Sequence, residues 1–474
     1  MRQAGSIPHF EKVTWPDLNI IGSLRVFQIK FGCFNLVSFF VASLATIAAA
    51  GDRPNVLVIV ADDLGYADLG FQGCKDIPTP NLDGLAKSGV KCTSGYVTHP
   101  FCSPTRAALL TGRYQQRFGH ENNPAWLPED LVAGLPLSET PLPSVLRTKG
   151  YATGCVGKWH LGAHPSFHPN RRGFEHYYGA LGGGHVYLDG LKGSVEYTIP
   201  MDRNGQGEPL KEYITTVFGH EASEYIKESK AKPWFLYLAF NAPHTPLQST
   251  PALQERVAHI ENKERRDFAA LVVAMDDAVG EVLSTLDSTG QRDNTLIFFF
   301  SDNGGPVAVT KCNNDPLRNG KGSVYEGGVR VPFLVSWPKK LPSGTTYNKP
   351  VVSLDVFATS IALASESTPK SSNLEGVNLI PFLTGEDKGS PHESLFWRTG
   401  GGATFAVRDG NWKLVGKRGG PSELYDLDKN VGETIDLATS EPAKLKQLEE
   451  AYQKWDANNI SPLFQSPKQG SKKK

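Results

Sequence analysis

The chain has 474 residues, of which 39% are hydrophobic and 21% are charged. This composition is typical of a globular protein that folds, and the length favours one large domain with a smaller second one. Lysine plus arginine equals aspartate plus glutamate, at 49 each. The chain therefore lacks the positive field that attracts nucleic acid, and an anionic substrate would have to be bound by locally clustered cations.

The first 50 residues have the pattern of an export signal. No residue from Phe31 to Gly51 is charged, basic residues lie upstream, and the run closes on three alanines. We expect a signal peptide, residues 1–50, that is removed near Ala50, and a secreted or periplasmic protein. A membrane anchor is the alternative, because the run is about long enough to span a bilayer. The strand predicted at residue 55 leaves almost no linker, so no stable anchor is expected.

Six cysteines are present, and one of them, Cys33, lies in the segment expected to be removed. Five remain, and an odd number in an exported protein suggests that one thiol has a role other than pairing. The other four could form up to two disulfides whose connectivity the sequence does not fix: Cys74, Cys92, Cys155 and Cys312. No Cys-x-x-Cys pair exists, which gives a zinc site little support.

Short apolar runs alternate with helical patterns along residues 51–385. The runs predict buried parallel strands at 55–60, 234–240, 295–300 and 333–337. Apolar residues at three- and four-residue steps predict a helix over 265–286, and further helices are expected after Pro80, Pro104 and Pro143 and over 212–228. We predict an α/β catalytic domain, 51–385, with a mostly parallel central sheet flanked by helices.

The sequence pattern changes after residue 385. Alternating stretches at 405–408 and 412–415, separated by Asp409-Gly410, predict antiparallel hairpins, and one last amphipathic helix follows. This predicts a small α+β C-terminal subdomain with an antiparallel sheet, residues 386–465. The lysine-rich tail, residues 466–474, is expected to be disordered.

Polar side chains follow the predicted strands at their carboxyl ends, where α/β proteins place their sites. Asp62 and Asp63 follow the first strand, and Asp302 and Asn303 follow the strand at 295–300. Three carboxylates and an amide oxygen suit Ca²⁺ or Mg²⁺. Each pair taken alone could simply cap a turn. Because both pairs end strands of one sheet, a metal site is favoured.

Further chemical groups reach the same edge of the sheet. His244 follows the strand at 234–240, and Lys158 and His160 follow a strand expected near Gly154. A single histidine or lysine of this kind is more often structural. Their convergence with the acidic residues favours a catalytic site.

The most specific pattern is Cys102-Ser103-Pro104-Thr105-Arg106. Pro104 near a helix start would set Cys102 at the helix N-terminus, where free N–H groups favour an anion. The alternatives are a buried structural cysteine or an ordinary reactive thiolate. Neither alternative explains why proline and arginine follow at these offsets.

This pentapeptide resembles the Cys-x-Pro-x-Arg signature of the type I, formylglycine-dependent sulfatases, of the arylsulfatase and N-acetylgalactosamine-6-sulfatase type, in the alkaline-phosphatase-like superfamily. The similarity spans about residues 53–455, in the family's order. Its other blocks are 55–63, 112–113, 157–162, 241–244, 302–305, 320–332 and 423–427.

The resemblance implies a sulfuric ester hydrolase acting on a sulfated glycan, with aryl sulfates as artificial substrates. It implies that a maturation enzyme acts on Cys102–Arg106 and oxidises Cys102 to 3-oxoalanine (formylglycine), the nucleophile. One Ca²⁺ would be bound by Asp62, Asp63, modified Cys102, Asp302 and Asn303. The implied catalytic residues are Cys102, Arg106, Lys158, His160, His244 and Lys321.

The roles that follow from the resemblance are specific. Arg106 and Lys158 would hold the hydrated aldehyde, and His160 would assist sulfate release. His244 and Lys321 would contact the sulfate and protonate the leaving alcohol. Five residues could line a sugar subsite, although each is more often structural: Arg171, Arg172, His176, Tyr187 and Arg318.

Two rival functions stay open at this point. One is a phosphodiesterase or phosphonate monoester hydrolase of the same superfamily, which a second metal site would favour. The other is a catalytically inactive protein that binds sulfated glycans. The presence of every residue of the implied site disfavours the second.

Overall fold

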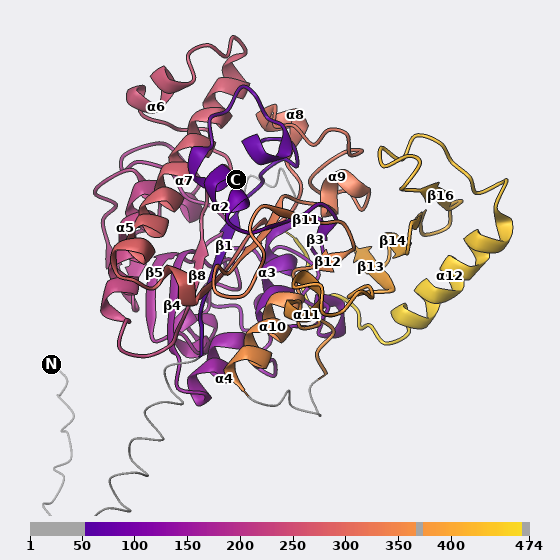
Figure 1. Cartoon of the computed structure of the whole chain (residues 1–474), viewed down its shortest axis with the longest axis horizontal. Helices are drawn as coiled ribbons and strands as arrows, with labels where there is room; N and C mark the ends of the chain where they lie inside the picture. Colours follow the sequence, from indigo (N-terminus) through magenta and orange to yellow (C-terminus); the bar gives the residue numbers. More distant parts are fainter. Residues whose placement is uncertain (1–52, 366–372, 467–474) are drawn as a thin grey trace, which may run out of the picture. The chain divides into compact units, whose positions relative to one another are not determined.

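The structure is a computed structural model that describes residues 53–365 and 373–466 (Figure 1). The predicted signal peptide and nearly all of the predicted tail lie outside these residues. Within them, no helix is both long enough and apolar enough to cross a membrane.

A ten-stranded sheet forms the centre of the described chain, in the order β11-β2-β10-β9-β1-β8-β4-β5-β6-β7. The strands β9, β1, β8, β4 and β5 are parallel neighbours. Their bounds are β1 Asn55–Ala61, β4 Ala152–Lys158, β5 His176–Ala180, β8 Trp234–Ala239 and β9 Thr295–Ser301. The others are β2 Val90–Cys92, β6 Met201–Arg203, β7 Gln206–Glu208, β10 Phe333–Ser336 and β11 Thr345–Tyr347. The predicted mostly parallel sheet is confirmed.

Strand β10 departs from the prediction, because it runs antiparallel to both β9 and β2. The apolar run at 333–337 marks burial but carries no information about strand direction. The connection from β9 to β10, residues 302–332, starts and ends at the same edge of the sheet. That edge is where the predicted site residues lie, so the antiparallel return keeps Lys321 beside them.

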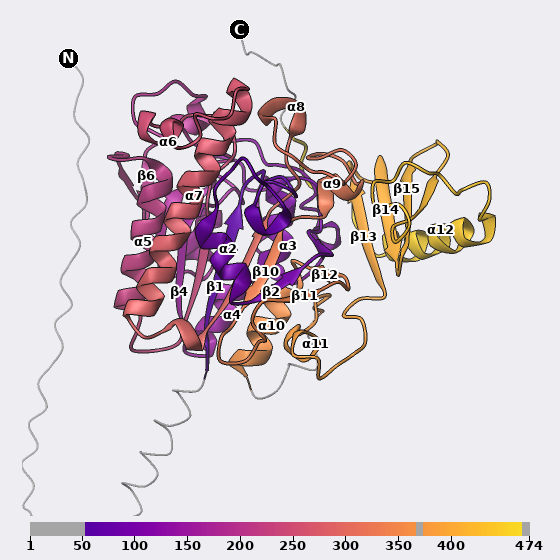
Figure 2. The ribbon, with the colours of Figure 1, turned by 45° about the horizontal axis from the view of Figure 1, so that its top comes forward.

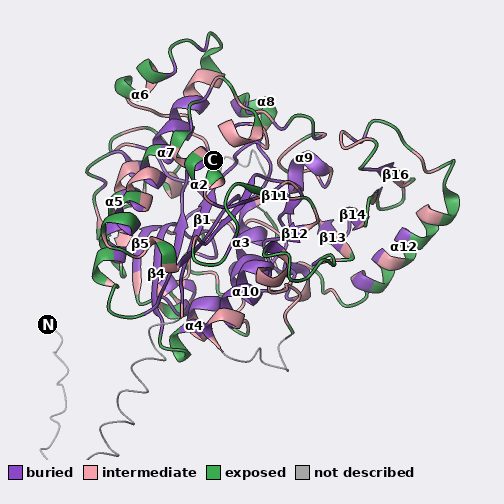
Figure 3. Ribbon diagram, in the orientation of Figure 1, coloured by how far each residue is buried: buried purple, intermediate pink, exposed green. Residues whose placement is uncertain are grey.

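Helices cover both faces of the sheet, giving three layers (Figures 1 and 2). Alternation in β1 serves both faces: Leu57 and Ile59 join one apolar core, and Val56 and Val58 join the other. The central strands β1, β4, β8 and β9 are buried along their whole length (Figure 3). The first core is shared with α2 (Pro80–Lys87), α5 (Ile214–Glu228) and α7 (Lys263–Ser288), and the second with α3 (Cys102–Thr111), α4 (Leu142–Thr148) and α10 (Asp355–Ala364).

The register of the central strands brings their carboxyl ends together. Val60 of β1 lies opposite Phe300 of β9 and Ala239 of β8. Gly157 of β4 also lies opposite Ala239. The residues that follow these strands therefore meet at one edge of the sheet. Short elements complete this part of the chain: β3 Gly95–Tyr96, β12 Val351–Val352, α6 Pro251–Arg256, α8 Val307–Thr310, α9 Glu326–Val329 and α11 Ile380–Leu383.

The five described cysteines are all free thiols: Cys74, Cys92, Cys102, Cys155 and Cys312. The disulfides that the sequence allowed are therefore not formed among these residues. For Cys92 and Cys155 the sheet gives the reason, because four strands separate β2 from β4. At about 4.8 Å a strand this separation is far beyond disulfide reach.

A separate antiparallel sheet follows residue 385, as predicted. Its strands are β13 Ser394–Thr399, β14 Thr404–Asp409, β15 Trp412–Lys417 and β16 Glu423–Asp426. The last helix, α12 (Pro442–Asp456), packs Leu448, Tyr452 and Trp455 into a core with this sheet. The boundary at residue 385 stays a prediction.

Buried charges join the small sheet to the segment that carries Lys321. Lys413 of β15 lies 2.8 Å from Glu326 Oε1, at the start of α9, and 3.2 Å from Glu433 Oε1. The side chains of all three are fully buried. Tyr96 also donates a 2.6 Å hydrogen bond to Glu326. Because α9 begins five residues after Lys321, this network helps to hold the segment in place.

We expect Lys413→Met to destabilise the protein by about 3–5 kcal/mol, because it removes the nearest cation from two buried carboxylates and leaves Glu326 with Arg330, at 3.3 Å, as its ion-pair partner. Urea unfolding followed by fluorescence measures this. The matched control is Lys446→Met, whose ammonium lies on the surface 3.8 Å from Glu450. The control should change the free energy of unfolding by less than about 0.5 kcal/mol. Equal effects of the two variants would contradict the assigned role.

Glu433 should make stability depend on pH. Burial, and to a lesser degree the charge of Glu326, raises its pKa from 4.5 to about 7, against the attraction of Lys413. A raised carboxyl pKa means that the folded state binds the proton more tightly than the unfolded chain does. The contribution of Glu433 to the free energy of unfolding should be greatest below pH 4.5 and should be lost as the pH rises through about 7. Glu433→Gln should remove this component, measured as the difference in urea unfolding between variant and wild type across that range.

Candidate active site

The ends of four neighbouring strands supply most of the site. Asp62 and Asp63 follow β1, Asp302 and Asn303 follow β9, His244 follows β8, and Lys158 ends β4. Backbone hydrogen bonds continue past the strands, from Asp302 N to Ala61 O and from Asp62 N to Ala242 O, each 3.0 Å long. The side chains are therefore held on an extended part of the sheet rather than on mobile loops.

Helix α3 places Cys102 at its first position. Phe101 before it is extended, and Gly112 closes the helix in a left-handed conformation with φ 66°. Only the prediction that the helix follows Pro104 needs adjustment, since Pro104 sits inside the first turn, where its missing N–H costs nothing. Cys102 is 1% exposed, and its thiol faces the strand ends.

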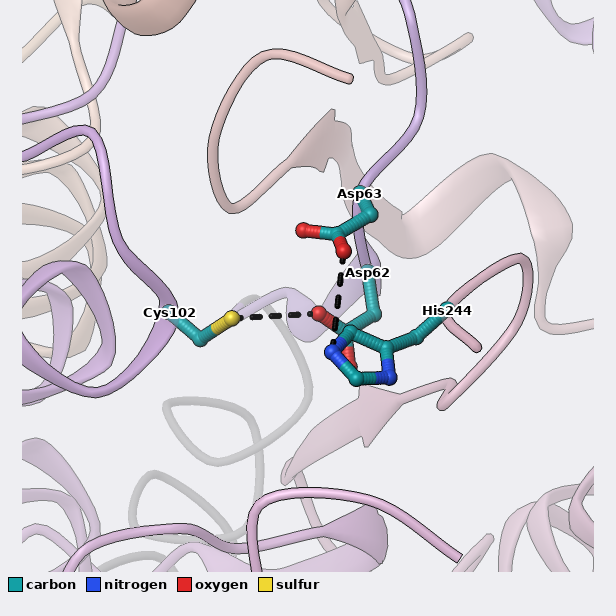
Figure 4. Close-up of side chains that lie close together, drawn as sticks. All are labelled: Asp62, Asp63, Cys102 and His244. Atoms are coloured by element: carbon teal, nitrogen blue, oxygen red, sulfur yellow. Dashed lines mark hydrogen bonds and ion pairs between the residues drawn. The ribbon is translucent and has the colours of Figure 1, made fainter. Parts of the chain in front are cut away.

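Asp62 links the cysteine to the first of three cations. Cys102 Sγ lies 3.3 Å from Asp62 Oδ1 (Figure 4). Lys158 Nζ lies 2.6 Å from Asp62 Oδ2. Burial, together with Asp302 and Asp62, raises the pKa of the Cys102 thiol despite the opposing lysines. The ordinary reactive thiolate, which requires a lowered pKa, is therefore disfavoured.

Asp63 lies beside Lys321 and His244. Lys321 Nζ is 2.7 Å from Asp63 Oδ1 and 3.5 Å from Cys102 Sγ, and His244 Nε2 is 3.6 Å from Asp63 Oδ2. Burial would raise the pKa of Asp63, but Lys321 and His244 outweigh it and lower that pKa to about 2. Burial and Lys321 lower the pKa of His244 to about 3, so this imidazole is neutral.

Arg106, one turn after Cys102, neutralises the third carboxylate. Its Nε and Nη2 both donate to Asp302 Oδ2, at 3.1 and 2.7 Å, and its Nη2 lies 3.8 Å from Asp62. Tyr237 accepts a further 3.3 Å bond from the guanidinium. Burial and Asp62 raise the pKa of Asp302 to about 6, against the attraction of Arg106.

His160 sits in a backbone conformation that non-glycine residues seldom adopt, with φ 58°. Asp63 is similar, with φ 69°. Such conformations cost on the order of 1–3 kcal/mol and gather at functional sites. Burial and then Lys158 lower the pKa of His160 well below its usual value, so this imidazole is neutral too.

Three buried side chains at this edge have four polar atoms without a hydrogen-bond partner among the described residues. They are the side-chain oxygen of Asn303, Nδ1 of His160 and both amide atoms of Asn241. Unpaired buried polar groups are costly, so a site that contains several is shaped for polar ligands. Asn303 is informative, because its Nδ2 donates 2.7 Å to Asp63 while its oxygen stays free. A free amide oxygen beside two carboxylates fits a hard divalent cation.

The side chains that could hold a metal ion in the structure overlap with the metal ligands predicted from the sequence. In the described residues one cluster of acidic, cysteine and histidine side chains could hold an ion: Asp62, Asp63, Cys102 and His244, with ligand atoms within 4.8 Å of one another. Asp302, which was predicted as a ligand, is engaged by Arg106 through Oδ2 and by the Asp63 amide through Oδ1. The exact ligand set therefore stays a prediction.

The residues suggested for a sugar subsite have structural contacts. Arg172 donates to the carbonyls of Pro136 and Glu139. Tyr187 donates to the carbonyls of Asn241 and His244 and so supports the site from behind. Arg318 stacks 3.9 Å above the Tyr325 ring. His176 begins β5, at the opposite end of the strand from the site, and Arg171 lines a separate cavity of about 760 Å³.

Sequence reasoning missed a tyrosine and a glutamate near the centre. Tyr197 lies with its ring 6.2 Å from that of His244. Glu196 and His160 both approach Gly183, where an added Cβ would be 3.1 Å from Glu196 Oε1 and 2.7 Å from His160 Nε2. The run Gly182-Gly183-Gly184 was the available signal, because consecutive glycines permit such close approach.

The fold and the site together define a class. An α/β protein with three carboxylates, three cations and a helix-terminal cysteine at its strand ends is built to bind and hydrolyse an anionic ester. The sulfatase family profile matches residues 54–366, and the profile of the N-sulphoglucosamine sulphohydrolase C-terminal region matches residues 319–455. The chain belongs to the sulfatase family, and it is a sulfuric ester hydrolase.

Curated relatives agree with this assignment. N-acetylgalactosamine-6-sulfatase of Canis lupus familiaris is 34% identical over 370 residues, covering 73% of this chain and 69% of the relative. Steryl-sulfatase of Mus musculus is 31% identical over 450 residues, covering 76% and 71%.

Solved structures confirm the alkaline-phosphatase-like sulfatase fold. A crystal structure of Ps i-CgsB in complex with k-i-k-neocarrahexaose has a TM-score of 0.82 and 39% identity, covering 88% of this chain and 95% of that one. The phosphonate monoester hydrolase of Agrobacterium radiobacter has a TM-score of 0.64 at 22% identity, covering 86% and 96%. This second likeness concerns the fold alone.

Gly183→Ala should lower sulfatase activity by about 100-fold, because displacing His160 by even 1 Å disturbs the geometry of the site. Activity is measured as kcat/KM for p-nitrophenyl sulfate. Gly84→Ala in α2 is the control, since its added methyl group meets nothing within 4 Å. Similar activity for both variants would show that the activity does not depend on the absence of a side chain at Gly183.

Proposed function

We propose that this sulfatase releases inorganic sulfate from a sulfated glycan with a formylglycine made from Cys102. The observation that carries the proposal is the position of Cys102. It lies at a helix N-terminus, within 3.5 Å of both Asp62 and the Lys321 ammonium. The hydrated aldehyde supplies an oxygen nucleophile at this point, which divides ester hydrolysis into two easier steps.

A single Ca²⁺ is the proposed cofactor, bound by Asp62, Asp63, Asp302, Asn303 and modified Cys102. The charges support it. Three carboxylates face three cations, so the formal charge of the ligand-free centre is zero. A divalent cation would leave the centre positive, which favours a sulfate ester and the further negative charge of its transition state.

The proposed roles of the remaining residues follow from their protonation states. Arg106 and Lys158 hold the nucleophile side, where they contact Asp302 and Asp62. Neutral His160 accepts a proton when sulfate leaves. Lys321 and neutral His244 contact the sulfate, and the Lys321 ammonium supplies the proton that the departing alcohol needs. Both lie on the accessible side, since His244 is 9% exposed and the Lys321 side chain 17%.

Support for a sulfated sugar as the substrate comes from the similar proteins. The similar N-acetylgalactosamine-6-sulfatases are named for a sugar substrate, and the similar structure of Ps i-CgsB is in complex with k-i-k-neocarrahexaose, which supports a glycan substrate.

The proposal also includes export and maturation. Residues 1–50 are proposed as the cleaved signal, and a maturation enzyme as the partner that recognises Cys102–Arg106. Because Cys102 is 1% exposed, that enzyme would have to reach it before the chain folds. Residues 386–465 are proposed as a distinct C-terminal subdomain.

The test is a mass measurement beside an activity assay, on protein from a host with sulfatase-maturation activity. We expect the tryptic peptide ending at Arg106 to be about 18 Da lighter than its thiol form, the difference between CH₂SH and an aldehyde. We expect sulfate release from p-nitrophenyl sulfate to be lost with EDTA and restored by Ca²⁺.

Cys102→Ala is the matched variant, since the small methyl group keeps the buried helix start intact. It should lose activity while unfolding as the wild type does. An unmodified Cys102 in a host that matures a known sulfatase would contradict the formylglycine proposal and would favour a protein that only binds sulfated glycans. Activity that survives EDTA would contradict the metal.

A further inference from the structure

Residues 182–198 form one wall of the catalytic centre, although Tyr187 is the only one of them that the sequence suggested for the site. The segment follows β5 and ends in a short 3-10 helix, Val195–Thr198. Val186 N donates 3.0 Å to Tyr197 O, and Gly183 N donates to the Glu196 carboxylate. The two ends of the segment are thereby fastened to each other.

The glycine run brings two side chains of this wall against the centre. An added Cβ on Gly184 would lie 2.9 Å from the Tyr197 hydroxyl, and one on Gly182 would lie 3.0 Å from Glu196 Oε1. Any larger residue in the run would push these side chains away. Tyr197 also lies edge-on to His244, at 65° between the ring planes.

Glu196 is unexpected in a site built for an anion. It forms no ion pair within the described ranges, although Lys158 attracts it. Its Oε1 accepts the Gly183 amide, and its Oε2 has no hydrogen bond to any other described residue. Burial raises its pKa above 4.5, while the Gly183 amide and Lys158 oppose that rise. The hydrogen bond from Gly183 and the nearby positive charge of Lys158 both favour the carboxylate form.

An ionised carboxylate beside an anion site does two things. It accepts hydrogen bonds from hydroxyl groups, since a carboxylate has acceptors only. It also repels any second anionic group that approaches, which is how a charged wall rejects wrong substrates. Tyr197 beside it offers an aromatic surface for the carbon face of a sugar.

We propose that Glu196 and Tyr197 select the substrate, and that the sulfated sugar carries a free hydroxyl rather than a second sulfate or a carboxylate beside the scissile ester. Glu196 accepts that hydroxyl through Oε2, and Tyr197 packs against the ring. This inference rests on the proposed sulfate-ester hydrolysis at Cys102 and adds the substrate class to it.

The test compares two sugars as inhibitors of p-nitrophenyl sulfate hydrolysis at about pH 8. The probes are galactose 6-sulfate and galactose 4,6-disulfate, and the quantity is the ratio of their inhibition constants. Wild type should bind the monosulfate more tightly. Glu196→Gln removes the charge and keeps an acceptor, so it should reduce that preference by about 10-fold or more.

A ratio is insensitive to partial misfolding, because loss of folded enzyme lowers both signals equally. Asp189→Asn is the matched control, since Asp189 is an exposed acid of the same segment. It should leave the ratio within about 2-fold of wild type. Tyr197→Ala should weaken the binding of both sugars while the preference persists.

Two results would overturn the inference, and they differ in what else they affect. If wild type releases sulfate and Glu196→Gln keeps the same preference, the selectivity assignment is wrong and the proposed function stands. If wild type carries formylglycine yet releases no sulfate from p-nitrophenyl sulfate, the proposed function fails and this inference falls with it.

Discussion

The site depends on the mutual compensation of buried charges gathered at the ends of three strands, β1, β4 and β9. Asp62, Asp63 and Asp302 would repel one another strongly in an interior of low dielectric. Lys158, Arg106 and Lys321 each stand within 3 Å of one of them. Each cation comes from a different part of the chain, so the charges can be balanced only when the sheet, α3 and the 302–332 connection are all in place.

That requirement explains much of the surrounding structure. The antiparallel return of β10 keeps the connection at the site's edge, and the buried contacts of Lys413 with Glu326 and Glu433 hold its far end. The small C-terminal sheet therefore supports the catalytic centre through a second set of compensated charges. Lys321 belongs to the charge cluster near Cys102, and Glu326 belongs to the charge cluster around Lys413. The segment that joins these two residues has fewer than ten residues.

The proposed substrate choice depends on a different part of the chain. The proposed metal ligands and sulfate contacts come mainly from residues at the ends of β1, β4, β8 and β9, whereas Glu196 and Tyr197 come from a glycine-rich excursion after β5. Such an excursion can vary without disturbing the strand ends. Separate origins for chemistry and selectivity are common in α/β enzymes, where a rigid sheet carries variable loops.

The sequence by itself determined the α/β class, the buried strands and the residues that end them, because apolar runs and strand-terminal acids are local patterns. It also determined the family, through a cysteine motif whose offsets packing does not explain. Only the tertiary structure decided the direction of β10, the free state of Cys92 and Cys155, and the position of Glu196 beside His160. These depend on which distant segments meet, and no local pattern of side chains records such meetings.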